Sequence, residues 1–417
     1  MRRIFVATIG FLLSSWKLPA QTDTLFINLS QADSIFQSGN FQLLASAMNI
    51  ESERAQIIQA KLYPNPVFSA LVNAYDPGNK QFFHVGTSGQ KQFQLDQLII
   101  LGGKRKAEIE LAKTNARIAE LEFQQLARTL KFRLHSTLFA IGQQEQLLGK
   151  FSYQLSLLDT LLTAYQEQAA RGNIALKEVV RLKGAYLQLN NDRAEIYRQY
   201  YESHATLQTL LGNTSPVVFR FSENDIEKYI KVYSLEDLTA SARRHRPELL
   251  LKEQDRLLAQ QWVAYQKKLA VPDMTVQGMY DQGSGAFNNE INIGVSIPLP
   301  LWNRNKGNIL SAQNKLKESE YNLQAVEVEM LSSIQNYYAL YLQTVTEYKK
   351  AVSLYNSDFE TTVNGMMINF QKRNVSIIEF IDFFEAYYDA LSELARIRTQ
   401  LVTSAEQLNA LTGTDIY

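Results

Sequence analysis

The sequence contains no cysteine among its 417 residues. This absence excludes disulfides, thiolate metal sites, cysteine nucleophiles and a lipid anchor on an N-terminal cysteine. An excess of charge of one sign is also lacking, because 42 lysine and arginine residues balance 42 aspartate and glutamate residues. A chain of this kind has no basic stripe for binding nucleic acid. With 46% hydrophobic residues, it can nevertheless bury a substantial core.

Long hydrophobic runs are missing too, because no stretch after the N-terminus reaches the roughly 20 apolar residues that a membrane-spanning helix needs. The first residues have the pattern of an export signal: Arg2 and Arg3 precede an apolar run, and Leu18-Pro19-Ala20 is a candidate cleavage site. We therefore predict a signal peptide over 1–20. Any part of the mature chain that lies in a membrane would have to be a β-barrel.

Proline is absent from two long stretches, residues 78–215 and 301–417. Because helix interiors exclude proline, both stretches are predicted to hold long helices. Each keeps a heptad rhythm of apolar and small residues, which would let neighbouring helices approach closely. The two rhythms lie 200 positions apart: Ile109, Ala112, Ala116, Ala119, Phe123, Leu126 and Leu130, then Ile309, Ala312, Leu316, Ser319, Leu323, Val326 and Met330.

Identical residues also recur 201 positions apart, as in Asn173/Asn374, Glu178/Glu379, Ala185/Ala386, Tyr186/Tyr387 and Gly212/Gly413. Pro66 and Pro272 correspond at an offset of 206, so a few residues differ in number between the two copies. The pattern predicts a tandem duplication. Its parts are a first repeat over 21–212, a linker over 213–234 and a second repeat over 235–417.

Each repeat is predicted to contain a helix, two strands, a long helix and a returning helix. In the first repeat the helices are expected at 31–62, 104–171 and 173–211, with strands at about 66–76 and 82–100. In the second they are expected at 236–270 (interrupted at Pro247), 304–372 and 374–412, with strands at about 273–281 and 289–299. A helix over 104–171 would be about 100 Å long at 1.5 Å per residue, which is too long for a compact globule.

The segments between the helices alternate apolar and polar residues, most regularly over 290–297. Each is close to the roughly 10 residues with which a tilted strand crosses a bilayer. Four strands cannot close a barrel, and lipid does not tolerate open sheet edges, so a membrane location would require several copies of the chain. The alternative is a pair of solvent-exposed hairpins on a helical protein.

The sharpest motif is Ser296-Ile297-Pro298-Leu299-Pro300-Leu301-Trp302-Asn303-Arg304-Asn305-Lys306-Gly307-Asn308. It resembles the hallmark of the CzcC-like branch of the TolC-type outer-membrane efflux family. Members of this branch serve heavy-metal resistance pumps. With the duplication, the resemblance covers essentially the whole mature chain. It implies a mainly α fold with a small β part. Tandem long-helix hairpins of three copies would form an α-helical barrel, and four strands per protomer would contribute to a 12-stranded outer-membrane β-barrel.

The resemblance implies an exit duct of a tripartite efflux pump that exports heavy-metal cations. The expected partners are two further copies of the chain, a periplasmic adaptor (membrane fusion protein), an inner-membrane RND pump and outer-membrane lipid, with no nucleic acid. The location would be the outer membrane, with a long periplasmic portion and no lipid anchor. One alternative is a duct for drugs or secreted polypeptides. Another is a periplasmic coiled-coil adaptor or scaffold without a barrel, although the lipoyl-like β-domain of adaptors is not evident.

The candidate functional residues lie near the two helical breaks. Glu379 and Asp382 resemble the acidic pair that rings the closed entrance in this family, and their spacing places both on one helix face. Threefold symmetry would turn them into two carboxylate rings; the alternative is solvated surface charge. In the first repeat Glu178 matches Glu379, but Arg181 stands near the place of Asp382, so ion pairs could hold the tips together. The candidate adaptor contacts are Gly172, Asn173, Ile174, Ala175, Arg373, Asn374, Val375 and Ser376, which could equally be simple turns.

No enzyme, cofactor or metal site is predicted, because the sequence shows no ordered set of histidine, carboxylate and nucleophile with recognisable spacing. His84, His135, His204 and His245 are scattered without an i, i+4 partner.

Overall fold

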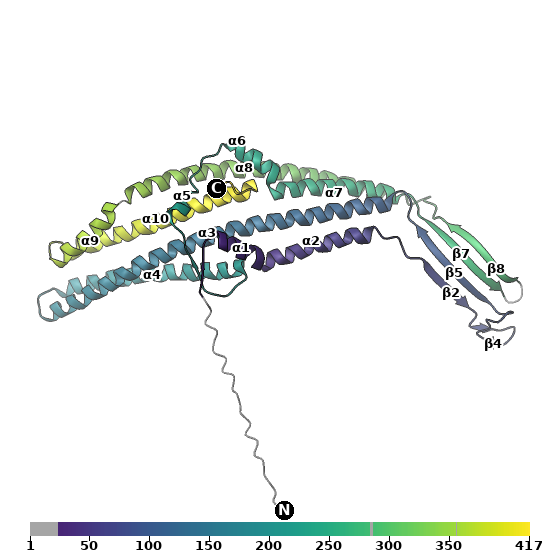
Figure 1. Cartoon of the computed structure of the whole chain (residues 1–417), viewed down its shortest axis with the longest axis horizontal. Coiled ribbons are helices and arrows are strands. Elements are labelled where there is room, and N and C mark those ends of the chain that lie inside the picture. Colours follow the sequence, from purple (N-terminus) through teal and green to yellow (C-terminus); the bar gives the residue numbers. More distant parts are fainter. Residues whose placement is uncertain (1–23, 284–286, 356) are drawn as a thin grey trace, which may run out of the picture.

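The computed structural model describes residues 24–283, 287–355 and 357–417. The predicted signal peptide over 1–20 lies outside these ranges. Long helices form an elongated, gently curved body, and an antiparallel sheet extends from one end of it (Figure 1). At the opposite end of the body, a short turn joins the long helix of each repeat to the helix that returns from it, so that each repeat forms a helical hairpin (Figure 1).

The first repeat contains short strands and four helices. Its elements are β1 (Leu25–Ile27), α1 (Leu29–Gly39), α2 (Phe41–Ala60), β2 (Val67–Val72), β3 (Tyr75–Asp76), β4 (Gln81–Phe82), β5 (Lys91–Ile99), α3 (Lys104–Ala170) and α4 (Leu176–Leu211). The linker holds β6 (Val217–Phe219) and α5 (Glu223–Glu227). The second repeat contains α6 (Leu235–His245), α7 (Pro247–Leu269), β7 (Met274–Gly283), β8 (Phe287–Ser296), α8 (Lys306–Leu354), α9 (Ser357–Gln371) and α10 (Ile377–Thr412).

The helix predicted over 31–62 is wrong as a single element, because Asn40 divides it into α1 and α2. The Asn40 side chain accepts a hydrogen bond from the amide of Leu43 at 3.0 Å and so caps the start of α2. Its amide group donates to the carbonyl of Leu210 at 2.8 Å. One buried asparagine therefore ends α1, begins α2 and binds the end of α4.

The helix predicted over 304–372 is also divided, into α8 and α9. The last residue of the first piece is followed by Tyr355, whose ψ of 75° is not helical. The sequence continues as Asn-Ser-Asp over 356–358. These residue types have low helix propensity in a helix interior and favour helix starts, because their side chains compete for backbone hydrogen bonds.

The duplication has a structural counterpart where each returning helix ends. Gly212 and Gly413 both have positive φ, 63° and 74°, and cap α4 and α10. A Cβ at Gly212 would lie 2.1 Å from the Gly39 carbonyl oxygen, and one at Gly413 would lie 2.3 Å from that of His245. Each helix end thus packs directly on the junction of the two helices that open its repeat, α1–α2 or α6–α7.

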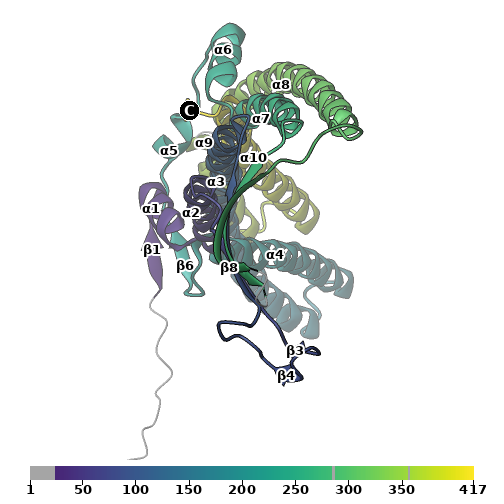
Figure 2. The ribbon, with the colours of Figure 1, turned by 90° about the vertical axis from the view of Figure 1, so that its right-hand side faces the viewer.

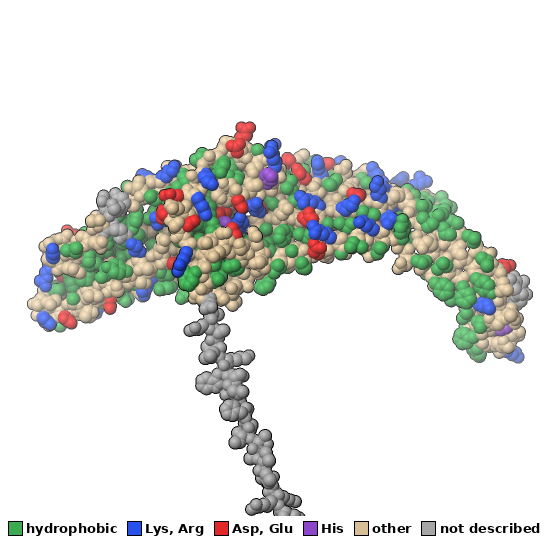
Figure 3. Space-filling view, in the orientation of Figure 1, with side chains coloured by type: hydrophobic (Ala, Val, Ile, Leu, Met, Phe, Trp, Pro, Cys, Tyr) green, Lys and Arg blue, Asp and Glu red, His purple; other side chains and the backbone are tan. Residues whose placement is uncertain are grey.

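The four-stranded sheet has the order β2-β5-β7-β8 and is antiparallel throughout. The register pairs Phe93 with Ala70 on one side and with Tyr280 on the other, and Tyr280 with Ile291. Apolar side chains therefore share one face, and Ile291 and Ile293 are 80% and 84% exposed there. Alternate positions such as Gln94 carry polar side chains on the other face. Figure 3 shows apolar side chains gathered over this end and charges over the helical body.

The main core lies at the middle of the body, where α1, α3, α10 and the linker meet. Strand β1 pairs in parallel with β6, beside α1 (Figure 2), and so ties the start of the first repeat to the linker. A second apolar cluster lies between the two hairpins, toward their tips. Within the described ranges, no helix combines the length and the apolar character that crossing a bilayer requires.

Candidate pore gate and hairpin tips

Glu379 lies in the first turn of α10 and takes part in the start of that helix. Its carboxylate accepts a hydrogen bond from the backbone amide of Ser376 at 2.9 Å, and its own amide donates to the Ser376 hydroxyl at 3.3 Å. This is a capping box, which satisfies two amides that have no partner within the helix. The hydrogen bonds from the Ser376 backbone and side chain lower the pKa of Glu379. The side chain is exposed, and its local role is to fix the helix start.

Asp382 lies one turn further along α10 and is exposed. It borders a hollow of about 490 Å³ between α10 and α4, together with Glu385 and, on the facing helix, Arg181 and Gly184. Glu379 does not border this hollow. The fold thus places Asp382 opposite Arg181 of the same protomer, although no ion pair within 4.0 Å joins these two described residues.

The two hairpin tips lie together at the end of the body opposite the sheet (Figure 1). Gly172 has φ 77°, and the amide of Asn173 returns to the carbonyl of Gln168 at 2.9 Å. Arg373 occupies the matching position with φ 63°, and the amide of Asn374 returns to Asn369 at 2.9 Å. The remaining predicted tip residues follow: Ile174 and Val375 are half-buried, while Ala175 and Ser376 are exposed.

Of the two matching tip residues, Gly172 and Arg373, Arg373 is the unusual one. The left-handed backbone conformation costs a residue with a side chain about 1 kcal/mol or more of free energy, which glycine avoids. Strain of this kind often accompanies a function of the side chain. Replacing Arg373 with glycine should therefore leave the protein as stable or up to about 1 kcal/mol more stable in thermal unfolding. If the tip contacts the adaptor, the same variant should bind it more weakly. The reciprocal variant, Gly172→Arg, should destabilise the first tip. A loss of stability in Arg373→Gly would show that the left-handed backbone conformation of Arg373 is not strained.

Aromatic rings join the two hairpins just above their tips. Phe370 of α9 stacks on Phe380 of α10 at 4.0 Å between ring centroids, and on Tyr165 of α3 at 5.9 Å. Deeper in the body, Phe151 of α3 meets Tyr388 of α10 at 4.8 Å. Burial raises the pKa of Tyr165, and the nearby charge of Glu178 adds to this effect. Any outward movement of one hairpin from the other would have to separate Tyr165 from Phe370 and Phe151 from Tyr388.

The sequence predicted no functional role for His135, but in the structure this residue lies at the centre of a buried network of charged side chains. Its Nδ1 lies 2.6 Å from a carboxylate oxygen of Glu406, and its Nε2 lies 2.8 Å from Asp33. The Tyr229 hydroxyl donates to the same Glu406 oxygen at 2.8 Å. Burial disfavours the imidazolium, but hydrogen bonds to Asp33 and Glu406 outweigh burial and raise the pKa of His135 to about 9. Because Glu406 is 271 positions away, no local pattern could have predicted the pair.

Metal-ligating side chains do not gather elsewhere in the part of the chain that the structure describes. No group of three or more histidine, aspartate or glutamate side chains there could hold a metal ion. His84 contacts Asp76 at 2.8 Å and Ser88 at 3.1 Å, in the loop that follows β4. The hydrogen bonds from Asn79 and His84 to Asp76 hold the pKa of its carboxyl well below the ordinary range. These contacts hold the loop after β4 against the end of β3.

Comparison with known proteins covers both repeats. Residues 238–414 match the model of the family described as outer membrane efflux protein. Across 99% of this chain and 100% of the relative, the sequence is 24% identical to the cobalt-zinc-cadmium resistance protein CzcC of Cupriavidus metallidurans.

Solved structures agree in fold along nearly the whole chain. A crystal structure of CusC has a TM-score of 0.75 at 15% identity, covering 94% of each chain. The CmeC outer membrane channel of Campylobacter jejuni has a TM-score of 0.76 at 14% identity, covering 99% of this chain and 94% of that one. The second repeat thus matches the outer membrane efflux protein family, and along nearly its whole length the chain resembles a cobalt-zinc-cadmium resistance protein in sequence and outer membrane channels in fold.

Proposed function

We propose that three copies of this chain form the outer-membrane exit duct of a tripartite efflux pump, and that the duct exports heavy-metal cations. The family and the fold are those of channel proteins. The observation that carries the proposal is the sheet, which has one apolar face, one polar face and two unpaired edges, β2 and β8. An apolar outer face and a polar interior are what a transmembrane barrel requires.

Oligomerisation follows from the open edges of the sheet. Unpaired backbone groups are not tolerated in lipid, and four strands are too few to enclose a channel. Pairing β8 of one copy with β2 of the next would remove every edge, and three copies would give the twelve strands expected for this family. The signal peptide predicted over 1–20 would carry the chain out of the cytoplasm, and the cysteine-free sequence offers no site for a lipid anchor.

The helical body supplies the reach of the duct. With 67 residues, α3 is about 100 Å long at 1.5 Å per residue. With the sheet in the outer membrane, the hairpin tips would lie deep in the periplasm. There they are placed to meet a periplasmic adaptor and, through it, an inner-membrane RND pump. The tip residues, Gly172 to Ala175 and Arg373 to Ser376, are the proposed contact surface.

The cargo is proposed from one relative, the cobalt-zinc-cadmium resistance protein, and from the motif over 296–308. Deleting the gene for this chain in its native host tests the proposal. Sensitivity to zinc, cobalt, cadmium or copper should increase, and the intact gene should restore resistance. Increased sensitivity to drugs alone would replace metal export with drug export, which is the alternative function within the same fold.

Asp382 and Arg181 are proposed to hold the two hairpins of a protomer together by mutual attraction across the hollow. Asp382→Asn should therefore raise the conductance of the purified trimer in a planar bilayer severalfold, and Arg181→Gln should do the same. Exchanging the charges, Asp382→Arg with Arg181→Asp, should restore low conductance. Glu379→Gln is the matched control, because glutamine can replace glutamate in a capping box. Unchanged conductance in intact Asp382→Asn trimers would remove the gate assignment.

A further inference from the structure

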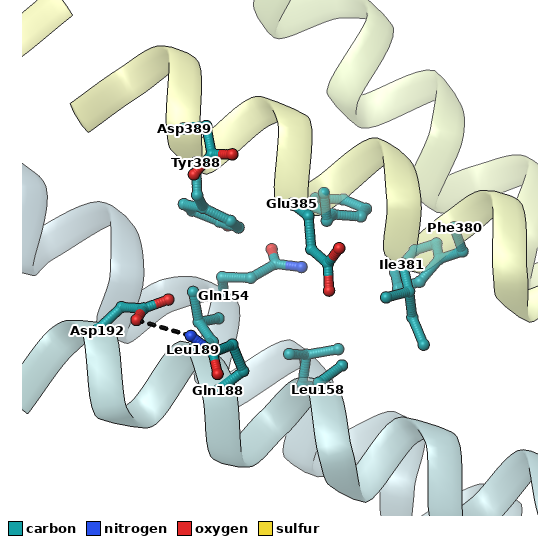
Figure 4. A pocket seen from close by; sticks show the side chains of 12 residues that line it. Gln154, Leu158, Gln188, Leu189, Asp192, Phe380, Ile381, Glu385, Tyr388 and Asp389 are labelled. Atoms are coloured by element: carbon teal, nitrogen blue, oxygen red, sulfur yellow. Dashed lines mark hydrogen bonds between the residues drawn. The ribbon is translucent and has the colours of Figure 1, made fainter. Parts of the chain in front are cut away.

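A furrow of about 420 Å³ lies between α4 and α10, with α3 as its floor (Figure 4). It continues the hollow beside Asp382, because Gln188 and Glu385 border both. Its volume lies within the range of small-molecule sites, about 300–1,000 Å³. The furrow is therefore large enough for a ligand of several heavy atoms.

Gln154 of α3 projects from the floor into this furrow, between Leu158 and Glu385 (Figure 4). The side chain is only 2% exposed, and its Nε2 has no hydrogen-bond partner among the residues that the structure describes. A buried amide without a partner is costly, by about 1–3 kcal/mol, so each such group needs an explanation. The two ends of an amide have nearly the same shape, so Gln154 can present either its N–H or its carbonyl oxygen to a ligand.

Carboxylates lie on both walls of the furrow. Asp192 lies on α4, and Glu385 and Asp389 lie on α10 (Figure 4). Gln188 donates to Asp192 at 3.0 Å and so holds that carboxylate at the furrow. Of the described residues that line the furrow, none is lysine or arginine. A cation entering it would meet three negative charges and no positive one.

The rest of the lining is apolar and aromatic. Leu158 and Leu189 flank the amide, and Phe384 and Tyr388 stack at 6.3 Å between ring centroids on the α10 wall. Aromatic faces attract organic cations, and their apolar surface favours a ligand with a hydrophobic body. A bare metal ion fits less well, because the described acidic side chains do not converge closely enough to coordinate one.

We propose that this furrow is a binding site for organic ammonium cations with an apolar body. The ammonium group would lie among Asp192, Glu385 and Asp389 and donate to the Gln154 carbonyl oxygen. The apolar body would lie against Phe384 and Tyr388. The proposed duct would therefore bind organic cations in addition to the metal ions it is proposed to export. The proposal for this site does not depend on metal ions being the cargo.

The test uses the purified full-length trimer and a matched pair of probes, 2-phenylethylammonium and neutral 2-phenylethanol, in isothermal titration calorimetry at pH 7. The ammonium should bind saturably, and the alcohol should bind at least about tenfold more weakly. Glu385→Gln and Asp389→Asn should each weaken ammonium binding about tenfold, as expected for a lost hydrogen bond to a charged group. Gln154→Leu should weaken it about fivefold while leaving the melting temperature unchanged or higher, because an unpaired buried amide is removed.

Asp159→Asn is the control, because it removes the same charge from α3 outside the furrow, and it should leave binding unchanged. Equal binding of the two probes would overturn the proposal, as would ammonium binding that none of the three furrow variants alters. Displacement of the ammonium by equimolar Zn²⁺ would also overturn it, because the furrow would then be a metal site. Failure of the ammonium to bind would leave the metal-sensitivity test of the duct unaffected, so the two proposals can fail separately.

Discussion

Replacing His135 with leucine should destabilise the protein by about 3–5 kcal/mol, because it leaves the Glu406 carboxylate buried without its cation. Glu406 is only 3% exposed, and hydrogen bonds from the Tyr229 hydroxyl and the Asn409 amide would remain as its partners. Those neutral donors cannot replace a charge. Thermal or chemical unfolding of the detergent-solubilised protein measures the loss.

The same network predicts how stability depends on pH. The pKa of His135 is about 9 in the folded protein, above the ordinary value of 6.5. A raised pKa means that the folded state binds the proton more tightly, so its contribution is complete below about pH 6.5 and disappears as the pH rises through about 9. On the acid side, burial opposes the charged form of Glu406, but the His135 hydrogen bond and charge lower its pKa. Its contribution is therefore lost only when the pH falls below the ordinary carboxyl range.

Two further variants separate a buried charge from simple loss of packing. His135→Leu combined with Glu406→Leu should recover part of the lost stability, since neither charge of the closer pair then remains. Lys131→Met removes a cation from the more exposed contact with Asp415 and should cost less than about 1 kcal/mol. If His135→Leu were no more destabilising than Lys131→Met, the network would have no special part in stability.

Replacing Ile293 with lysine should prevent stable insertion in the outer membrane. Ile293 is 84% exposed on the apolar face of β8. A lysine on the lipid face near the middle of the bilayer costs about 2–4 kcal/mol, and three copies would each bear that cost. The expected result is a large loss of protein from the outer-membrane fraction, measured by fractionation and immunoblotting.

The matched control for this variant is Asn292→Lys, which adds the same charge to the adjacent position on the polar face. Asn292 pairs with Met279 and points away from the face that carries Ile293. Because the interior of a barrel is wet, this variant should reach the outer membrane at nearly the normal level. Equal tolerance of both lysines would mean that the apolar face does not meet lipid.

Much of this fold could be predicted because its periodic signals are long. The proline-free stretches and the heptad rhythm predicted a helix over 104–171, and α3 runs from Lys104 to Ala170. The alternation over 290–297 predicted a strand, and β8 ends at Ser296. The break at Pro247 was also expected, because proline cannot continue a helix but suits its first turn.

The break at Asn40 was not expected, although the duplication contained the signal. The offset that pairs Pro66 with Pro272 also pairs Asn40 with Arg246, the residue that separates α6 from α7. Asparagine alone is tolerated within helices, so propensity could not reveal the break. It is determined by tertiary contact, since the end of α4 lies against this junction.

The candidate site was harder to predict than the fold. The spacing of Glu379 and Asp382 placed them on one helix face but could not show that Glu379 caps its helix while Asp382 faces Arg181. The network of His135 and the unpaired amide of Gln154 each depend on helices that are distant in sequence. Such pairings require knowledge of how α3, α4 and α10 pack.

The proposed trimeric barrel is tested most directly by disulfide crosslinking between the β2 and β8 edges of neighbouring copies. Because the natural sequence contains no cysteine, only the introduced cysteines can form disulfides. Single cysteines are placed in β2 and β8 of the same chain, in the combinations of Phe68 or Ala70 with Ile293 or Val295, and the protein is oxidised in isolated outer membranes. A trimeric barrel predicts that at least one combination gives covalent species of two and three copies, and none larger. A chain that stays monomeric in every combination, and is recovered in the water-soluble fraction, would contradict the account.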